Sequence, residues 1–421
     1  MIQTVNLYPG VRLHCCRCGR FKQGALSIQF LQPMARETAA MNALLPAVLL
    51  RGSRKHPDMR SITRQLDELY GASVSALVRR IGDCQTTGFF SAFLEDRFAM
   101  DGEQILGPAV DFLGELLFQP LTEKGAFCES FVEGEKKNLI ATIESELNDK
   151  RVYAASRLLK LMCKGDSFGL PRLGEKEQVA AITAQSLFAH YEDLIRHSPV
   201  ELFYVGSAPA DRVAALLKEL FADLQGERAE MPAQTALRAA DPQEVTETME
   251  VAQAKLGMGF VTPVTNRSED FAAMQVTNAL FGAGQTSKLF MNIREKMSLC
   301  YSVGSGYYGT KGVLTVSAGI DADKAELTKN EVLAQLEDCR SGNFTEEELA
   351  AAKEGILSSL RGIHDTPGAI ENYYCTSAIA GTGLTPARYM ELVEAVTAHK
   401  VTQMAKSLKL HTVYLLKGAD K

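Results

Sequence analysis

Two hydrogen-bond donors in the second half of the chain could act on a substrate. Arg294 and Tyr301 lie seven residues apart, in a segment that begins with a glycine-containing loop at 282–284. A guanidinium presents several fixed donors and a phenol presents one more, a combination suited to holding a peptide carbonyl or a developing oxyanion. The alternative interpretation is structural: Arg294 would form a surface ion pair with a neighbour such as Glu295, and Tyr301 would belong to the core.

Cysteine and histidine give weaker evidence of a site. Cys15, Cys16 and Cys18 stand beside His14, which suggests a metal centre. Alternation along a strand would point Cys15 away from the other two, however, and no second pair at ligand spacing follows. The nine cysteines are scattered and odd in number, which favours reduced thiols. No two histidines lie at i,i+4, so structural or surface roles are expected for all seven: His14, His56, His190, His197, His364, His399 and His411.

Composition restricts the class of protein. The chain has 421 residues, of which 46% are hydrophobic and 23% charged, a balance typical of a folded protein with more than one domain. Its net charge is -6, from 45 Lys plus Arg against 51 Asp plus Glu, so nucleic acid is not an expected partner. No stretch approaches about 18 apolar residues and the first residues lack a signal-peptide pattern, which predicts a cytoplasmic protein without a membrane anchor.

Periodicity predicts an α+β protein in which strands come first and helices follow. The predicted strands are Thr4 to Leu13, Gly24 to Leu31, Val74 to Val78 and Thr86 to Phe93. Met41, Leu44, Leu45, Val48 and Leu49 share one face of a helix that ends near Gly52. Further helices are expected over Ser61 to Tyr70, Gly107 to Phe118 and Thr122 to Leu161.

The chain also repeats itself. The tetrapeptide at 181–184, Ala-Ile-Thr-Ala, precedes a helix and an apolar strand, and Ala-Val-Thr-Ala at 395–398 does the same about half a chain later. Each half also has a helix expected to begin at a capping threonine, Thr122 or Thr345. Two similar α+β domains are therefore predicted, at 1–225 and 245–421, with 226–244 as linker because this stretch has no apolar stripe.

The segment at 280–303 reads Leu-Phe-Gly-Ala-Gly-Gln-Thr-Ser-Lys-Leu-Phe-Met-Asn-Ile-Arg-Glu-Lys-Met-Ser-Leu-Cys-Tyr-Ser-Val. It resembles the second-domain stretch of the M16 metallopeptidases, the insulinase, pitrilysin and mitochondrial processing peptidase family. Arg294 and Tyr301 keep the family's spacing of an Arg on a helix and a Tyr at the start of a strand. The whole chain resembles the short, M16B-like branch. This resemblance implies two duplicated domains, each an antiparallel or mixed β-sheet with helices packed on one face, and a substrate-binding role for Arg294 and Tyr301.

The resemblance also implies a zinc motif that the chain lacks. Active members carry His-x-x-Glu-His on the first long helix and a second glutamate on a later helix. Counting back from the Arg-Gly-Ser at 51–53 places Ala43, Pro46 and Ala47 at the motif positions, and none of them can bind zinc or move a proton. The later glutamate maps to Thr142, with Glu144 or Glu135 as alternatives. The helix would be apolar all round and buried.

These expectations together suggest a catalytically inactive subunit of a heterodimeric zinc peptidase. The chain itself would hold no cofactor and no catalytic residue. A related M16 subunit with an intact motif would supply zinc and the general base, and this chain would supply half of a peptide-binding chamber with Arg294 and Tyr301. The peptide substrate would add a strand to a sheet edge. The alternatives are a scaffold subunit without proteolytic function, as in respiratory complexes that resemble this family, and a homodimeric peptide-binding protein.

Overall fold

The computed structural model describes residues 2–224 and 226–419, which form two compact units. Unit 1 contains the described residues up to Glu144, with Leu170–Ala233 and His364–Ile379. Unit 2 contains Ser145–Gly169, Gln234–Ile363 and the described residues from Ala380 onward. Each unit therefore includes one segment from the other half of the chain. Within residues 2–224 and 226–419, no helix is long and apolar enough to cross a membrane.

Unit 1 is built on a six-stranded mixed sheet. Its strands are β1 (Ile2–Tyr8), β2 (Val11–Arg17), β3 (Gln23–Pro33), β4 (Ser73–Ile81), β5 (Cys84–Leu94) and β8 (Val200–Gly206). They lie in the order β1-β2-β8-β3-β5-β4, and only the pairing of β2 with β8 is parallel. A small two-stranded sheet pairs β6 (Thr122–Glu123) with β7 (Ala126–Phe127).

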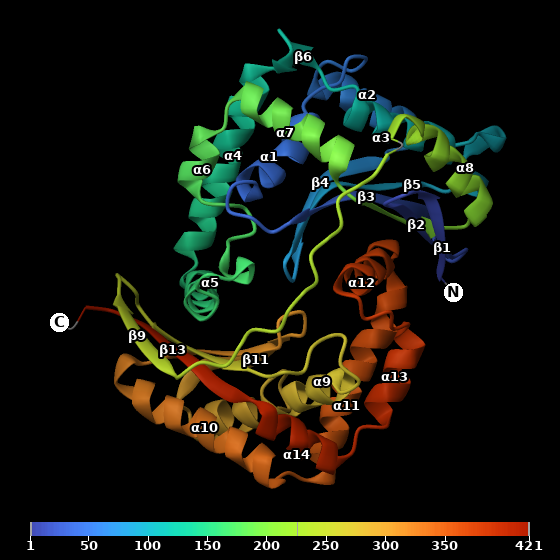
Figure 1. The fold of residues 1–421 in the computed structure, drawn as a ribbon. Helices are drawn as coiled ribbons and strands as arrows, with labels where there is room; N and C mark the ends of the chain where they lie inside the picture. The colour runs from blue at the N-terminus through green and yellow to red at the C-terminus, as the bar shows by residue number, and fades with distance from the viewer. Residues whose placement is uncertain (1, 225, 420–421) are drawn as a thin grey trace. The chain divides into compact units, whose positions relative to one another are not determined.

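One face of this sheet is covered by helices, as Figure 1 shows, and the main core of the unit lies between the two layers. The helices of the unit are α1 (Ala39–Leu49), α2 (Met59–Glu68), α3 (Leu106–Phe118), α4 (Glu129–Asn148), α6 (Lys176–Ala181), α7 (Ala184–His197) and α8 (Ala210–Leu220). Alternate residues of β3, Leu26, Ile28 and Phe30, enter this core and are fully buried. Ser27 and Gln29, between them, are buried as well but polar, so the alternation separates an apolar face of β3 from a polar one.

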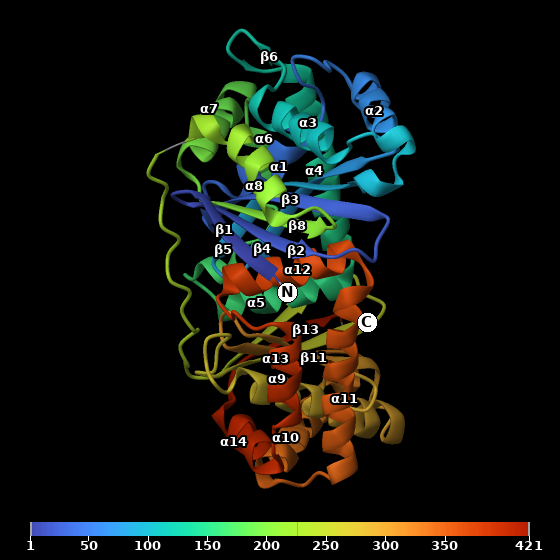
Figure 2. The same cartoon turned by 90° about the vertical axis from the view of Figure 1, so that its right-hand side faces the viewer.

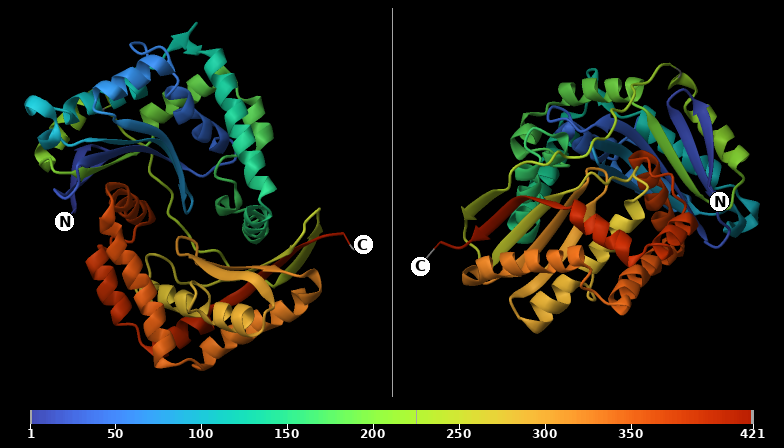
Figure 3. Two further views of the ribbon diagram at one scale, coloured as in Figure 1. Left: turned by 180° about the vertical axis from the view of Figure 1, so that it is seen from behind. Right: turned by 60° about the horizontal axis from the view of Figure 1, so that its bottom comes forward.

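Unit 2 has a five-stranded mixed sheet, with most of its helices again gathered on one face (Figures 1 and 3). The strands are β9 (Gln243–Thr248), β10 (Ala254–Val261), β11 (Cys300–Tyr308), β12 (Val313–Ile320) and β13 (Lys409–Lys417). The helices are α9 (Phe271–Phe281), η5 (Leu289–Lys296), α10 (Ala325–Ser341), α11 (Glu346–Gly362), α13 (Pro386–Glu394) and α14 (Ala398–Ser407). The strand order is β11-β12-β10-β13-β9, and the pair β13 with β9 is parallel.

The two sheets have the same topology. The order β4-β5-β3-β8-β2 in unit 1 corresponds to β11-β12-β10-β13-β9 in unit 2, with the single parallel pair at the same place. Thr183 and Thr397 each cap the helix that leads into the equivalent strands β8 and β13. The predicted fold class, two similar α+β units with mixed sheets, is confirmed.

The equivalent helices α5 (Lys150–Met162) and α12 (Pro367–Ala380) are exchanged between the halves of the sequence. Each follows the long helix of its own half, α4 or α11, but α5 packs on the sheet of unit 2 and α12 on the sheet of unit 1. Each covers part of the sheet face that the other helices leave open; Figure 2 shows α5 and α10 on opposite sides of the sheet of unit 2. This placement was not part of the predicted fold.

Three predicted element boundaries were wrong. The strand expected over Thr4 to Leu13 is a hairpin, because the chain turns at Gly10, whose φ of +69° is a left-handed conformation. Thr122 does not cap a helix but begins β6, and α4 starts only at Glu129. The long helical pattern to Leu161 is two helices, because Asp149 caps α5 through a bond from the Arg151 amide, at 2.9 Å.

One of the points at which the chain passes from unit 1 to unit 2, between Ala233 and Gln234, lies within a stretch at 227–242 that has neither helix nor strand. The boundaries expected from the sequence, 1–225, 226–244 and 245–421, stay a prediction. Gln225, at the first boundary, lies outside the described residues.

Candidate functional site

The three positions that the resemblance assigns to the zinc motif lie on α1. Ala43 and Pro46 are buried, Ala47 is partly buried, and all three lie in unit 1. None carries a side-chain oxygen, nitrogen or sulfur atom, so the residues present do not fit a zinc ion. Pro46 lies inside the helix, and its carbonyl accepts the Leu50 amide at 3.2 Å, so the helix continues past it. Nine of the eleven residues of α1 are buried, as the apolar pattern predicted.

The one polar side chain of α1 is occupied by structural hydrogen bonds. Asn42 donates to Gln85 at 2.9 Å and lies 2.7 Å from Nε2 of His190. Burial lowers the pKa of His190, so the imidazole is neutral and its Nε2–H can donate to the amide oxygen of Asn42. Thr87 donates to the Asn42 carbonyl at 2.7 Å. This network fixes α1 to β5 and α7 and is fully used within the protein.

None of the three candidates for the later glutamate forms a catalytic group with α1. Thr142 is exposed on α4 and donates to the carbonyl of Asn138 at 2.9 Å. Glu135 accepts from Arg51 at 3.1 Å and from Asn138 at 3.1 Å, through different oxygens. Glu144 lies 3.6 Å from Lys176 on the surface. The negative charge of Glu135 is thus paired with Arg51, just beyond α1.

Cys15 and His14, near the N-terminus, have structural surroundings. Cys15 enters the core of unit 1, and burial raises its pKa to about 11, so its thiol stays protonated. His14 lies 2.7 Å from Glu201 and stacks on Phe203, with ring centroids 4.5 Å apart. In the described part of the chain, no group of three or more His, Cys, Asp or Glu is arranged to hold a metal ion.

Arg294 lies on η5 of unit 2 with an accessible guanidinium. Its side chain is 41% exposed; the guanidinium carbon is 4.6 Å from the centre of the Phe290 ring, and Nε is 3.7 Å from Glu295. The ion pair with Glu295 matches the structural alternative, but an exposed pair of this length contributes no more than about 1 kcal/mol. Stacking on Phe290 orients the guanidinium while leaving its donors accessible.

Tyr301 is not a core residue. It is 64% exposed and its hydroxyl lies 3.4 Å from Oδ1 of Asp321. It sits on the edge strand β11, where the pairing with β12 shifts register between Cys300 and Ser302. A bulge of this kind turns one side chain out of the regular alternation of the strand. The spacing of the sequence indicated the residue but gave no sign of the bulge.

The structure brings Arg294 and Tyr301 to the same junction of unit 2. The Leu299 amide donates to the Ile293 carbonyl at 3.0 Å, which ties the end of η5 to the start of β11. Burial raises the pKa of Cys300, and the positive charge of Arg294 opposes this effect, so the guanidinium acts on the residue next to Tyr301. Ala43, Pro46, Ala47 and Thr142 belong to unit 1.

Comparison with known proteins places the chain in a family. A model of the peptidase M16 inactive domain matches residues 181–356. A protein of Bacillus subtilis named probable inactive metalloprotease YmfF is 31% identical over 413 residues, which cover 98% of this chain and 97% of that protein. The chain therefore belongs to the M16 peptidase family. Within that family it is a homologue of a protein named as a probable inactive metalloprotease.

Solved structures show the same fold. The crystal structure of a conserved protein from Enterococcus faecalis superposes with a TM-score of 0.93 at 28% identity and covers 100% of this chain and 99% of its own. The peptidase M16 inactive domain from Pseudomonas fluorescens has a TM-score of 0.82 at 18% identity, over 100% of this chain and 98% of its own. The resemblance drawn from the sequence is confirmed.

Proposed function

We propose that the chain is the non-catalytic subunit of a two-subunit M16-type peptidase and supplies half of its peptide-binding chamber. The observation that carries the proposal is a contrast between two sites. The motif positions Ala43, Pro46 and Ala47 have no catalytic atoms, whereas Arg294 and Tyr301 are both exposed at one junction. A related subunit with His-x-x-Glu-His would supply zinc and the general base.

Arg294 and Tyr301 would orient the scissile carbonyl of a peptide bound in the complex. Both are donors, and fixed donors stabilise the negative charge that develops on a carbonyl oxygen when it is attacked. Phe290 orients the guanidinium, and the phenol has only a long 3.4 Å contact with Asp321, so a substrate carbonyl would replace Asp321 as the acceptor of its single hydrogen. Their chemistry needs no proton transfer and no metal ligand in this chain.

The edge strand β11 gives such a peptide a backbone to pair with. As the first strand in the order of its sheet, it pairs with β12 on one side only. An extended peptide can add to an edge of this kind through main-chain hydrogen bonds. Tyr301 at the start of β11 would then lie beside the added strand.

A scaffold subunit is the second candidate. Its assembly would need a stable surface but no exposed donor pair, so the exposure of Arg294 and Tyr301 favours the peptidase partner. A peptide-binding protein that does not cut would use the same donors in a homodimer. Activity of a mixed complex distinguishes the peptidase partner, and formation of a mixed complex without activity distinguishes a scaffold from a homodimer.

The test is to co-express the chain with a related subunit from the same organism that carries an intact His-x-x-Glu-His. We expect the two to elute together in size-exclusion chromatography, with an interface of more than about 1,000 Å². The complex should hydrolyse a generic fluorogenic peptide, and this chain alone should not. Two separate monomer peaks, with no activity on mixing at micromolar concentration, would contradict the proposal.

A further inference from the structure

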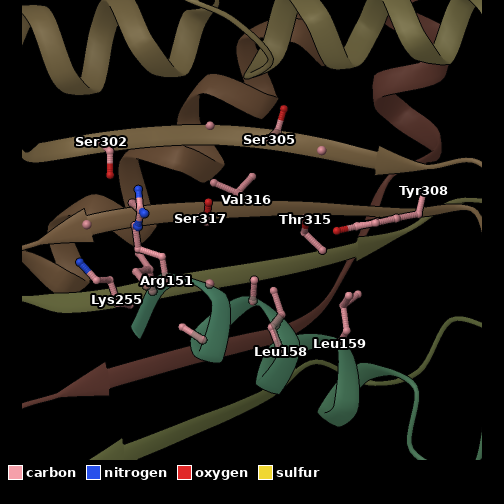
Figure 4. A pocket seen from close by; sticks show the side chains of 18 residues that line it. Arg151, Leu158, Leu159, Lys255, Ser302, Ser305, Tyr308, Thr315, Val316 and Ser317 are labelled. Atoms are coloured by element: carbon pink, nitrogen blue, oxygen red, sulfur yellow. The ribbon is translucent and has the colours of Figure 1, made fainter. Parts of the chain in front are cut away.

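Unit 2 contains a cavity of about 370 Å³ between α5 and the face of its sheet formed by β10, β12 and β11. Its volume is within the range of small-molecule sites, roughly 300–1,000 Å³. Figure 4 shows Arg151 and Lys255 at one end and Tyr308 at the other. Phe168 packs against Tyr308, with ring centroids 5.6 Å apart. Every lining residue belongs to unit 2.

The cavity exists because the exchanged helices are placed differently on equivalent sheets. In unit 1, α12 contacts β3 and β4, where Glu371 bonds to Gln29 and Arg79. In unit 2, α5 packs instead toward the other edge of the sheet, where Arg157 pairs with Glu247 on β9. The face of β11 and β12 is therefore left without a helix directly on it. Its counterpart in unit 1, β4 and β5, is approached by α12.

Two glycines of β11, Gly304 and Gly306, enlarge the cavity at positions where the fold does not require glycine. A Cβ added to Gly306 would meet only Thr315 Oγ1, at 3.9 Å, and one added to Gly304 only a carbonyl at 3.6 Å. Both distances are ordinary contacts, and neither residue has the positive φ that favours glycine. By contrast, a Cβ at Gly259 on β10 would collide with Met162 of α5. The small residues of β11 thus leave space that the fold itself does not fill.

The floor of the cavity carries hydroxyl groups that the protein does not use. Ser302, Thr315 and Ser317 line it from β11 and β12. Among the residues that the structure describes, none of these three hydroxyls has a hydrogen-bond partner. The opposite wall, on α5, is apolar and includes Leu158 and Leu159. An alkyl chain would bury the hydroxyls unpaired, whereas the amide groups of a peptide would pair with them.

The end of the cavity at Arg151 and Lys255 is positively charged. Asp149 accepts from Nη2 of Arg151 at 3.0 Å, while Lys255 bonds to Gln253, whose side chain is neutral. Two cations thus share one carboxylate. Burial lowers the pKa of Lys255, and the charge of Arg151 lowers it further. An anion bound at this end would relieve that repulsion.

We infer that this cavity binds a short peptide segment, with its carboxylate held by Arg151 and Lys255 and its amide groups on the hydroxyls of β11 and β12. The carboxylate can belong to the C-terminus of the peptide or to an acidic side chain. The inference goes beyond the proposed function, since it involves neither Arg294 nor Tyr301 and needs no partner subunit. It can therefore be tested on the chain alone.

The experiment is isothermal titration calorimetry of the full chain with three N-acetylated probes. These are trialanine with a free C-terminus, its C-terminal amide, and Ala-Glu-Ala amide. We expect the trialanine amide to bind at least about tenfold more weakly than the free acid, because a charge-assisted hydrogen bond is lost. If the Ala-Glu-Ala amide binds as tightly as the free acid, the site also accepts acidic side chains. If it binds more weakly than the free acid, the site is specific for the C-terminal carboxylate.

Variants then locate the site. Lys255→Gln and Arg151→Gln should each weaken binding of the acid by about five- to twentyfold, a loss expected for one charged contact. Gly306→Leu should abolish binding of every probe by filling the cavity. Lys406→Gln, an exposed lysine on α14, is the matched control and should bind the acid normally. Equal binding of acid and amide, no heat at millimolar acid, or unchanged affinity in both charge variants would each overturn the inference.

Discussion

Glu371 and Arg79 are 292 positions apart in the chain, yet both carboxylate oxygens of Glu371 accept from the guanidinium of Arg79, at 3.0 and 2.8 Å. Ser27 also donates to Glu371, at 2.6 Å. This contact fixes the exchanged helix α12 to unit 1. The ion pair that holds α5 in unit 2 has its charges placed the other way round. There the arginine, Arg157, is on the helix α5 and the carboxylate, Glu247, is on the sheet.

Removal of the Glu371 carboxylate should destabilise unit 1. Glu371 is 1% exposed, so Glu371→Ala would leave the Arg79 cation without its partner in a largely buried site, which costs about 3–5 kcal/mol. Urea unfolding followed by circular dichroism measures the loss, and hydrogen exchange locates it in α12. The double variant Glu371→Leu/Arg79→Met should recover most of the stability. A loss below about 1 kcal/mol in the single variant would show that the pair does not hold the helix.

Acid should loosen α5 from unit 2. Burial would raise the pKa of Glu247, but hydrogen bonds from Arg157 and Tyr414, with the charge of Arg157, outweigh it and leave the pKa below its ordinary value. A carboxyl group whose pKa is lower in the folded protein stabilises the fold at pH values above its pKa in the unfolded chain, about 4.3. This contribution is lost as the pH falls through the pKa of the folded state.

The measurement compares the unfolding free energies of the wild type and of Glu247→Gln at pH values from neutral to below about 4. Their difference should be largest near neutral pH and shrink below pH of about 4, since the wild-type carboxyl is then protonated as well. A difference that stays constant with pH would mean that the charge of Glu247 does not stabilise the docked helix.

The sequence predicted the repeated architecture because local signals survive in both halves. Thr183 and Thr397 each stand just before a helix as expected, and the alternation of Leu26, Ile28 and Phe30 matches the apolar face of a strand. The exchange of α5 and α12 was missed because periodicity shows which face of a helix is apolar but not which sheet covers it.

The same limit applies to the candidate site. The residue types at 43, 46 and 47 need no contact information to show that these side chains cannot bind zinc, while their assignment to the motif rests on the resemblance. The exposure of Tyr301 depends on a bulge against β12, which arises from strand pairing over a long separation. Likewise, the ion pair between Arg51 and Glu135 joins the turn after α1 to α4, and no local pattern in the sequence records that approach.

Restoration of the motif should not restore an enzyme. In the triple variant Ala43→His, Pro46→Glu, Ala47→His, two of the new side chains replace buried residues, so overpacking costs about 1–3 kcal/mol. Thr142 gives no further ligand, and Glu135 is bound by Arg51. We expect no stoichiometric zinc and no turnover by metal analysis and a fluorogenic peptide assay. Zinc-dependent turnover by this variant alone would show that the surroundings of α1 still support the metal.

The central claim, that this chain contributes Arg294 and Tyr301 to a partner's catalysis, is tested most directly by turnover of the reconstituted complex. Loss of one oxyanion donor lowers turnover by roughly 10²- to 10³-fold in enzymes, so Tyr301→Phe and Arg294→Ala should each lower the rate by about one to three decades. Zinc content and co-elution should not change. The matched controls are Tyr8→Phe, whose hydroxyl bonds a backbone carbonyl in unit 1, and Arg388→Ala, an exposed arginine on α13. The account predicts full rates for these two controls and reduced rates for the two site variants; full rates in all four would contradict it and favour the scaffold.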